Sequence, residues 1–198
     1  MDRKKLAIFI SAALNAPLIG ILTFIPLILS QQPEDPFVLI SLTTLFGAIL
    51  PLSSTYYLVR KGIIPDLYAS DRATRTEPFL WAMASYLTGV TALLYVNAPF
   101  VVTALMACYF VNAIVMLVIT LYWKISIHAV GVSGPVTALV FELGAKMLIF
   151  FLLMLPVGWA RVELKAHNKL QVAAGAILSS ILTWLQMVFY VNFLLPMI

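Results

Sequence analysis

Charged residues are scarce in this chain of 198 residues. Lysine, arginine, aspartate and glutamate together make up 10% of it, whereas 63% of the residues are hydrophobic and the mean hydropathy is +1.03. Because soluble domains carry roughly 25% charged residues, this composition excludes an ordinary soluble protein. A helix needs about 20 apolar residues to cross a bilayer, so the length allows six or seven spans and little else. We expect residues 1–198 to form a single integral membrane domain, an all-α polytopic helical bundle.

Cysteine is almost absent as well. The one thiol, Cys108, lies inside an apolar run, so an intrachain disulfide and a metal-thiolate site are excluded. No histidine and carboxylate share a helix at the spacing of a zinc site. The net charge of +4 is modest, and no basic run carries interleaved aromatic residues, so nucleic acid is not an expected partner. We expect no metal and no cofactor.

Long apolar runs, separated by polar turns, predict the membrane spans. The first run is longer than the apolar core of a signal peptide, so we expect it to be retained as a span. The second is expected to kink at Pro51, and Asn15 and Asn112 are expected to form hydrogen bonds between helices. The spans predicted with little ambiguity are residues 6–29, 37–59, 79–96, a fourth that ends near Trp123, and a last one over 169–195.

The segment from Ile125 to Ala160 has two interpretations. A single long, tilted span would place Glu142 and Lys146 near the middle of the membrane, where charges are costly. A hairpin of two short helices would place the same pair at its apex, near an interface. We favour the hairpin and hence seven spans, with six as the alternative, because the hairpin also returns the segments on either side of it to the same face.

The basic residues support this topology. With seven spans, eleven of the twelve lysines and arginines fall on the face that holds the N-terminus. Cytoplasmic loops of membrane proteins carry an excess of such residues, so this face is expected to be cytoplasmic and the protein to be a multi-pass component of the cell membrane.

Residues 161–175, Arg-Val-Glu-Leu-Lys-Ala-His-Asn-Lys-Leu-Gln-Val-Ala-Ala-Gly, gather cations and a histidine at the start of the last span. The chain has two histidines, and the second, His128, lies in a similar junction after Trp123 and Lys124. A guanidinium is a good anchor for phosphate, and an imidazole can attack phosphorus or move protons near neutral pH. Cations at a lipid interface can also be simple anchors, but their spacing with the two histidines favours an enzyme that acts on a phosphorylated lipid.

The spacing of these residues resembles the signatures of the type 2 phosphatidic acid phosphatase superfamily, as in a divergent prokaryotic membrane member. Arg161, five residues, His167, three residues and Gln171 match the third signature, except that the family has aspartate at the last position. Ile125-Ser126-Ile127-His128 is a decayed form of the second, Pro-Ser-Gly-His. Around Arg72 and Arg75 the first signature is only weakly matched, with Glu77 in place of an arginine. The resemblance covers about residues 60–176.

The resemblance implies a metal-independent mechanism. His167 would attack phosphorus and form a phosphohistidine, and His128 would protonate the leaving oxygen and then activate water. Gln171 would orient His167 in place of the family aspartate. The residues implied in phosphate binding are Arg161, Arg72, Arg75, Lys124 and Ser126.

Two functional hypotheses follow. The first is a hydrolase of isoprenoid or phospholipid metabolism that releases phosphate from a lipid phosphate monoester or a polyprenyl (di)phosphate. The second is a non-catalytic lipid-phosphate-binding, transport or assembly protein on the same bundle, suggested by Gln171 and the decayed first signature. Membrane lipids and the phosphorylated lipid itself are the expected partners.

Overall fold

The computed structural model describes residues 2–69 and 71–194, and this part of the chain contains helices and no strand. The α-helices are α1 (Arg3–Ala13), α2 (Ala16–Ser30), α3 (Pro36–Thr44), α4 (Leu50–Arg60), α5 (Thr76–Tyr95), α6 (Phe100–Tyr122), α7 (Ile127–Leu143), α8 (Met154–Glu163) and α9 (Lys169–Phe189). The irregular helices are the π-helices η1 (Leu45–Ile49) and η4 (Tyr190–Leu194) and the 3₁₀-helices η2 (Arg72–Thr74) and η3 (Ala145–Leu153).

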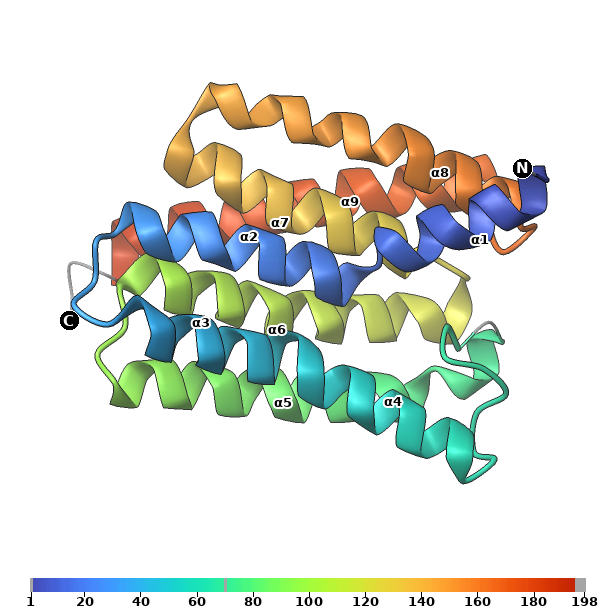
Figure 1. Cartoon of the computed structure of the whole chain (residues 1–198), viewed down its shortest axis with the longest axis horizontal. Coiled ribbons are helices and arrows are strands. Elements are labelled where there is room, and N and C mark those ends of the chain that lie inside the picture. The colour runs from blue at the N-terminus through green and yellow to red at the C-terminus, as the bar shows by residue number, and fades with distance from the viewer. Residues whose placement is uncertain (1, 70, 195–198) are drawn as a thin grey trace.

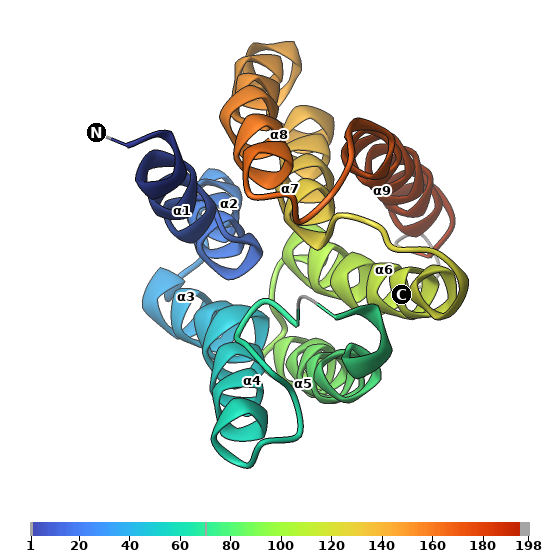
Figure 2. The ribbon, with the colours of Figure 1, turned by 90° about the vertical axis from the view of Figure 1, so that its right-hand side faces the viewer.

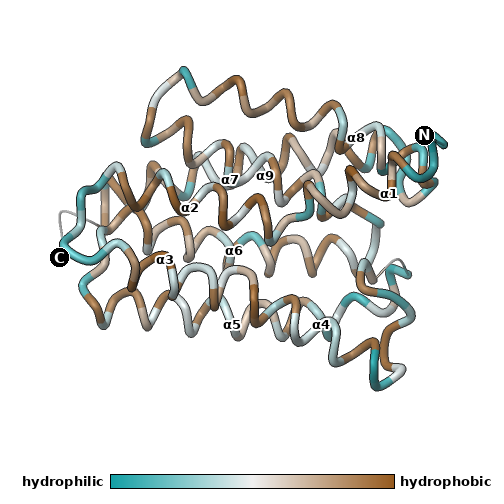
Figure 3. Tube along the Cα trace, viewed as in Figure 1, coloured by the Kyte–Doolittle hydropathy of each residue, from teal (hydrophilic) through white to brown (hydrophobic). Residues whose placement is uncertain are grey.

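The helices run side by side along the long axis, and the connecting loops collect at its two ends (Figure 1). Hydrophilic residues concentrate in the same two end regions, whereas the middle of the bundle is mostly apolar (Figure 3). Large apolar side chains such as Phe9, Leu155 and Ile177 are exposed around the bundle. An apolar outer surface of this kind suits a lipid environment, in which backbone groups are satisfied within helices.

The first predicted span is two helices rather than one. α1 and α2 meet at an angle of 44°. The bend is stabilised by Asn15, whose side-chain oxygen accepts a hydrogen bond from the Leu18 N–H and whose amide donates to the Ala12 carbonyl. Asn15 therefore caps α2 locally, and the prediction that it bonds to another helix was wrong. The same prediction for Asn112 is confirmed, because its amide donates to the Thr183 hydroxyl of α9.

The second predicted span is continuous but irregular. α3 passes into α4 through the π-helix η1, and Pro51 occupies the first turn of α4. Proline lacks the N–H that an inner helical position needs, and a π-helix accommodates such a break in the hydrogen-bond ladder. The irregularity thus begins at Leu45, before the helix reaches Pro51.

The predicted hairpin is confirmed. α7 ends at Leu143, Gly144 turns the chain with φ of 89°, and η3 and α8 run back beside it. The side chain of Glu142, next to the turn, accepts a hydrogen bond from Gln31. Five helices of the described chain are long and apolar enough to cross a membrane, or six if the bent pair α1–α2 is one span; α7 is shorter.

Glycines let α7 approach its two neighbours closely. A Cβ atom at Gly131 would lie 2.1 Å from the Cβ of Ala16 in α2, and one at Gly175 of α9 would lie 2.8 Å from the carbonyl oxygen of Ser126. Small residues at such crossings allow helix backbones to pack in contact. The start of α7, which carries His128, is therefore held between α2 and α9.

Candidate functional site

The predicted site residues lie in loops and helix ends at one end of the bundle. Seen from that end, the N-terminal start of α1, the loop between α4 and α5, the α6–α7 linker and the α8–α9 loop all face the viewer (Figure 2). The one basic residue at the opposite end is Lys146, which follows the Gly144 turn. The hairpin produces this arrangement, because it brings the end of α8 back to the start of α7.

Arg161 is the most informative residue at this end. Its side chain is 4% exposed, its Nη1 donates to the Ser11 hydroxyl at 2.7 Å, and its guanidinium carbon lies 5.7 Å from the centre of the Tyr68 ring. Its buried Nε has no hydrogen-bond partner among the described residues. Arg161 lines a cavity of about 220 Å³ together with Ser11 and Tyr68. A buried cation with an open donor favours an anion as ligand.

His128 belongs to the same cluster. Its Nε2 lies 3.2 Å from both the hydroxyl and the carbonyl oxygen of Ser11, and its ring centre is 5.6 Å from that of Tyr68. Ser11 and Tyr68 therefore each contact both Arg161 and His128. Ser11 does so through hydrogen bonds. Tyr68 does so through its ring, which lies under the Arg161 guanidinium and is tilted by 47° to the His128 ring.

His167 lies in the α8–α9 loop and is 6% exposed. Its Nδ1 is 3.2 Å from the Gln171 side-chain oxygen, which also accepts a hydrogen bond from the Asn168 backbone N–H. Because an amide oxygen only accepts, Nδ1 carries the proton and Nε2 keeps its lone pair. Asn168 and Gln171 also form a capping box that fixes the start of α9. The same glutamine thus positions both the helix and the imidazole.

The surroundings of His167 keep it neutral. Burial lowers its pKa from 6.5 to about 4, and the nearby charges of Arg75, Arg161 and Lys124 act in the same direction, whereas the Gln171 hydrogen bond opposes them. A neutral imidazole is the form that can act as a nucleophile at pH 7.

The two arginines of the α4–α5 loop have different positions. Arg75 is 4% exposed and donates to the carbonyl oxygens of Ala69 and Ile125, which ties the loop to the α6–α7 linker. Arg72 is exposed and donates to the carbonyl oxygens of Thr120 and Leu121, at the C-terminal end of α6. A cation at this end of a helix satisfies its last carbonyl groups. The structure therefore brings Arg75, and not Arg72, to the histidines.

Lys124 and Ser126 lie in the α6–α7 linker. Burial and the charges of Arg75 and Arg161 lower the pKa of Lys124, which places its ammonium within electrostatic range of both. The Ser126 hydroxyl is fully buried and accepts from the Ala129 N–H as the N-cap of α7, while its own backbone N–H donates to the Gln171 carbonyl. Ser126 joins α7 to α9, and Lys124 joins the cationic cluster.

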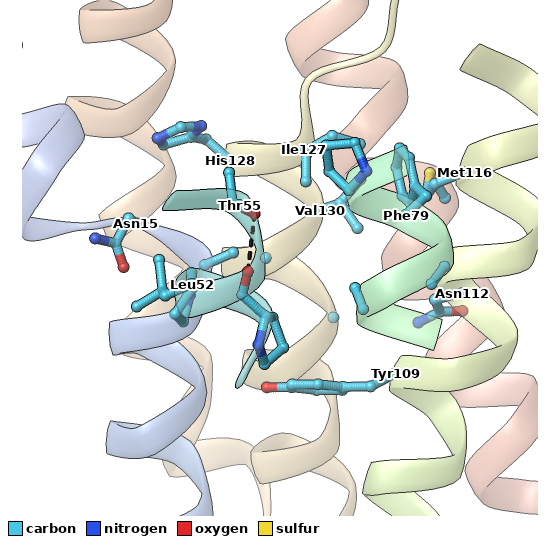
Figure 4. A pocket seen from close by; sticks show the side chains of 18 of the residues that line it. Asn15, Leu52, Thr55, Phe79, Tyr109, Asn112, Met116, Ile127, His128 and Val130 are labelled. Carbon is cyan, nitrogen blue, oxygen red and sulfur yellow. Dashed lines mark hydrogen bonds between the residues drawn. The ribbon is translucent and has the colours of Figure 1, made fainter. Parts of the chain in front are cut away.

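A second, larger cavity of about 350 Å³ begins at His128 and Arg75 and extends into the bundle as far as Tyr109 and Asn112. Figure 4 shows His128 at one end of it and Tyr109 and Asn112 farther along, with Leu52 and Phe79 on its walls. Most of its lining is apolar. Tyr68 lines both cavities, so the smaller cavity beside Arg161 and the larger apolar cavity adjoin at this ring.

Sequence reasoning missed Ser11 and Tyr68. Ser11 is a small polar residue in the first apolar run, and a polar side chain inside a span is a reason to suspect a functional contact. Tyr68 had no such signal, because an aromatic residue in an interfacial loop is an ordinary membrane anchor.

Comparisons of the chain with protein-family models, with curated proteins and with solved structures find no match. The described residues also contain no group of three or more His, Cys, Asp or Glu side chains that could hold a metal ion. The fold itself is an all-helical bundle with five or six apolar helices that could cross a membrane, consistent with a multi-pass membrane protein.

The lowered pKa of His167 predicts a pH dependence of stability. A histidine in the unfolded chain has a pKa near 6.5, so between pH 6.5 and about 4 the unfolded state binds more protons than the folded state. The free energy of unfolding should therefore fall as the pH drops through this window, by roughly 3 kcal/mol in total. His167→Gln, which cannot titrate, should lose this part of the slope. Thermal melting in detergent between pH 7.5 and 4 measures it, and parallel curves for the two proteins would contradict the assignment.

Proposed function

We propose that this protein is a membrane phosphatase that hydrolyses a lipid phosphate monoester or a polyprenyl (di)phosphate through a phosphohistidine intermediate. The observation that carries the proposal is the buried Arg161 guanidinium, whose Nε lacks a partner within the described chain, in a cluster with two buried or partly buried histidines. The match of residues 161–171 to the third signature of the type 2 phosphatidic acid phosphatase superfamily supports it, and we propose membership in that superfamily.

The cations supply the phosphate site. Arg161 offers its free Nε–H to one phosphate oxygen, and Arg75 and Lys124 lie within electrostatic range of it. In a site from which water is largely excluded, such charges stabilise the negative charge that develops in the transition state far better than they would in water. Cations in these positions do the work that a metal ion does in other phosphatases.

The two histidines supply the chemistry. The Nε2 lone pair of His167 forms a bond to phosphorus while the bond from phosphorus to the lipid oxygen breaks. His128, which takes up a proton when the phosphate anion offsets the charges of Arg161 and Arg75 beside it, gives that proton to the leaving oxygen. The result is a phosphohistidine and a lipid alcohol, or, from a polyprenyl diphosphate, a phosphohistidine and the polyprenyl monophosphate. His128, now neutral, takes a proton from water as the water oxygen attacks phosphorus. Inorganic phosphate leaves, and His167 is free again.

The lipid chain occupies the larger cavity. This cavity begins beside His128 and Arg75 and is lined mainly by apolar side chains, so a chain can lie among the helices while its phosphate meets the cations. The apolar lining of this cavity suits either an acyl chain or a polyprenyl chain, because both are apolar.

We extend the proposal to the topology. The bent pair α1–α2, counted as one span, brings the number of long apolar spans to six, and α7, whose 17 residues span roughly 25 Å, makes a seventh. The excess of lysine and arginine at the end that carries the site favours its placement on the cytoplasmic side.

The direct test is the release of inorganic phosphate by the purified protein from a panel of lipid phosphates and polyprenyl diphosphates. We expect release that survives a metal chelator and is lost in His167→Ala, because no other group in the site replaces the nucleophile.

Arg161→Gln should lower kcat/KM by at least about a hundredfold, as expected for removal of a buried charged hydrogen-bond donor.

Arg3→Gln is the matched control. Arg3 is a surface arginine at the same end, paired with Glu163 at 3.3 Å, and its loss should leave the rate within about a factor of two. A wild-type protein that binds lipid phosphates and hydrolyses none of them would overturn the enzyme proposal in favour of the non-catalytic binder.

Gln171 provides a second prediction. Its oxygen holds the Nδ1–H of His167 at 3.2 Å, so Gln171→Leu should release the ring and lower kcat by about 10- to 100-fold. Gln171→Asp keeps an acceptor and adds a charge that stabilises the imidazolium, so we expect it to retain or raise activity. Initial rates of phosphate release compare the three proteins. If Gln171→Leu is as fast as wild type, the glutamine does not orient the nucleophile.

A further inference from the structure

The N-terminal helix contributes to the site, although no signature motif lies in it. Ser11 is on α1, which packs against α8, and its side chain is 1% exposed. Arg161 of α8 and His128 of α7 both bond to it. Three helices that are distant in sequence therefore meet at one serine.

The hydroxyl of Ser11 has a defined role in these contacts. A guanidinium can only donate, so the oxygen accepts from Arg161 Nη1 at 2.7 Å. The same hydroxyl oxygen has a second lone pair and lies 3.2 Å from His128 Nε2. The Ser11 carbonyl oxygen is also 3.2 Å from Nε2, so a proton on Nε2 has two acceptors on Ser11. If Nε2 keeps this proton while Nδ1 gains and loses its own, Ser11 holds the imidazole in both protonation states.

We propose that Ser11 is a positioning residue that anchors His128 through Nε2 and links it to Arg161, so that Nδ1 is the nitrogen that exchanges protons with the substrate. The anchor is needed because an acid–base histidine changes its protonation state during each turnover and must keep its orientation in both states. The inference rests on the proposed phosphatase function, and it adds α1 to the machinery of the site.

The charged and titratable groups around His128 are consistent with this role. Arg161 of α8, Arg75 of the α4–α5 loop and His167 of the α8–α9 loop all lie within electrostatic range, and the Tyr68 ring lies beside the imidazole, tilted by 47° to it. The hydrogen bonds of the His128 side chain are to Ser11 alone in the described part of the chain.

The test uses the fact that the protein has only two histidines. In ¹⁵N-histidine-labelled protein in detergent, the imidazole signals are assigned by their loss in His128→Gln and in His167→Gln. Ser11→Ala should shift the Nε2 signal of His128 and leave both signals of His167 in place, and Ser11→Thr, which keeps the hydroxyl, should restore the wild-type position. The matched control is Ser133→Ala, which removes an equally buried hydroxyl that bonds within α7 to the Ala129 carbonyl.

Kinetics supply a second readout. Ser11→Ala should lower kcat about tenfold for a lipid phosphate with a poor, alkyl leaving group, and less for an aryl phosphate, because proton donation matters most when the leaving oxygen is basic. A His128 signal that stays in place in Ser11→Ala, or that moves equally in Ser133→Ala, would overturn the proposal. Because the spectra need no substrate, they decide the role of Ser11 even if the wild-type protein releases no phosphate and the proposed function itself fails.

Discussion

A buried guanidinium in an apolar bundle is the constraint around which this structure is built. Removing a cation from water costs several kcal/mol unless its donors are satisfied. Arg161 has one donor on the Ser11 hydroxyl, the face of Tyr68 against its plane, and an Nε with no partner within the described residues. An anion that binds there would complete the arrangement, and the ligand that we propose is a phosphorylated lipid.

The rest of the site follows from bringing distant segments to that guanidinium. The turn at Gly144 returns α8 to the level at which α7 begins, and the close contacts of Gly131 and Gly175 hold the start of α7 against α2 and α9. The bend at Asn15 lets α1 tilt away from α2 and lie against α8. Helix packing by small residues and one local cap therefore set the geometry of the charged groups.

Much of this could be predicted from the sequence, because composition and apolar periodicity act along the chain. The helical bundle, the hairpin and the bond of Asn112 to another helix follow from such local signals. The bend at Asn15 was missed because an asparagine inside an apolar run has the same signature whether it caps a helix or bonds across one. The choice between Arg72 and Arg75 depends on which carbonyl groups lie nearby in space, and the contacts of Ser11 cross more than 100 residues of sequence. No local pattern encodes them.

We propose His167 as the nucleophile of an anion site built around Arg161. The most direct measurement is to mix the protein with a ³²P-labelled lipid phosphate, quench within milliseconds, and map the label on the chain. We predict an acid-labile, base-stable phosphohistidine at His167, present at a higher level in His128→Ala, where its hydrolysis is slowed, and absent in His167→Ala. Phosphate release without any label on His167, or a label that persists in His167→Ala, would contradict the assignment of His167 as the nucleophile.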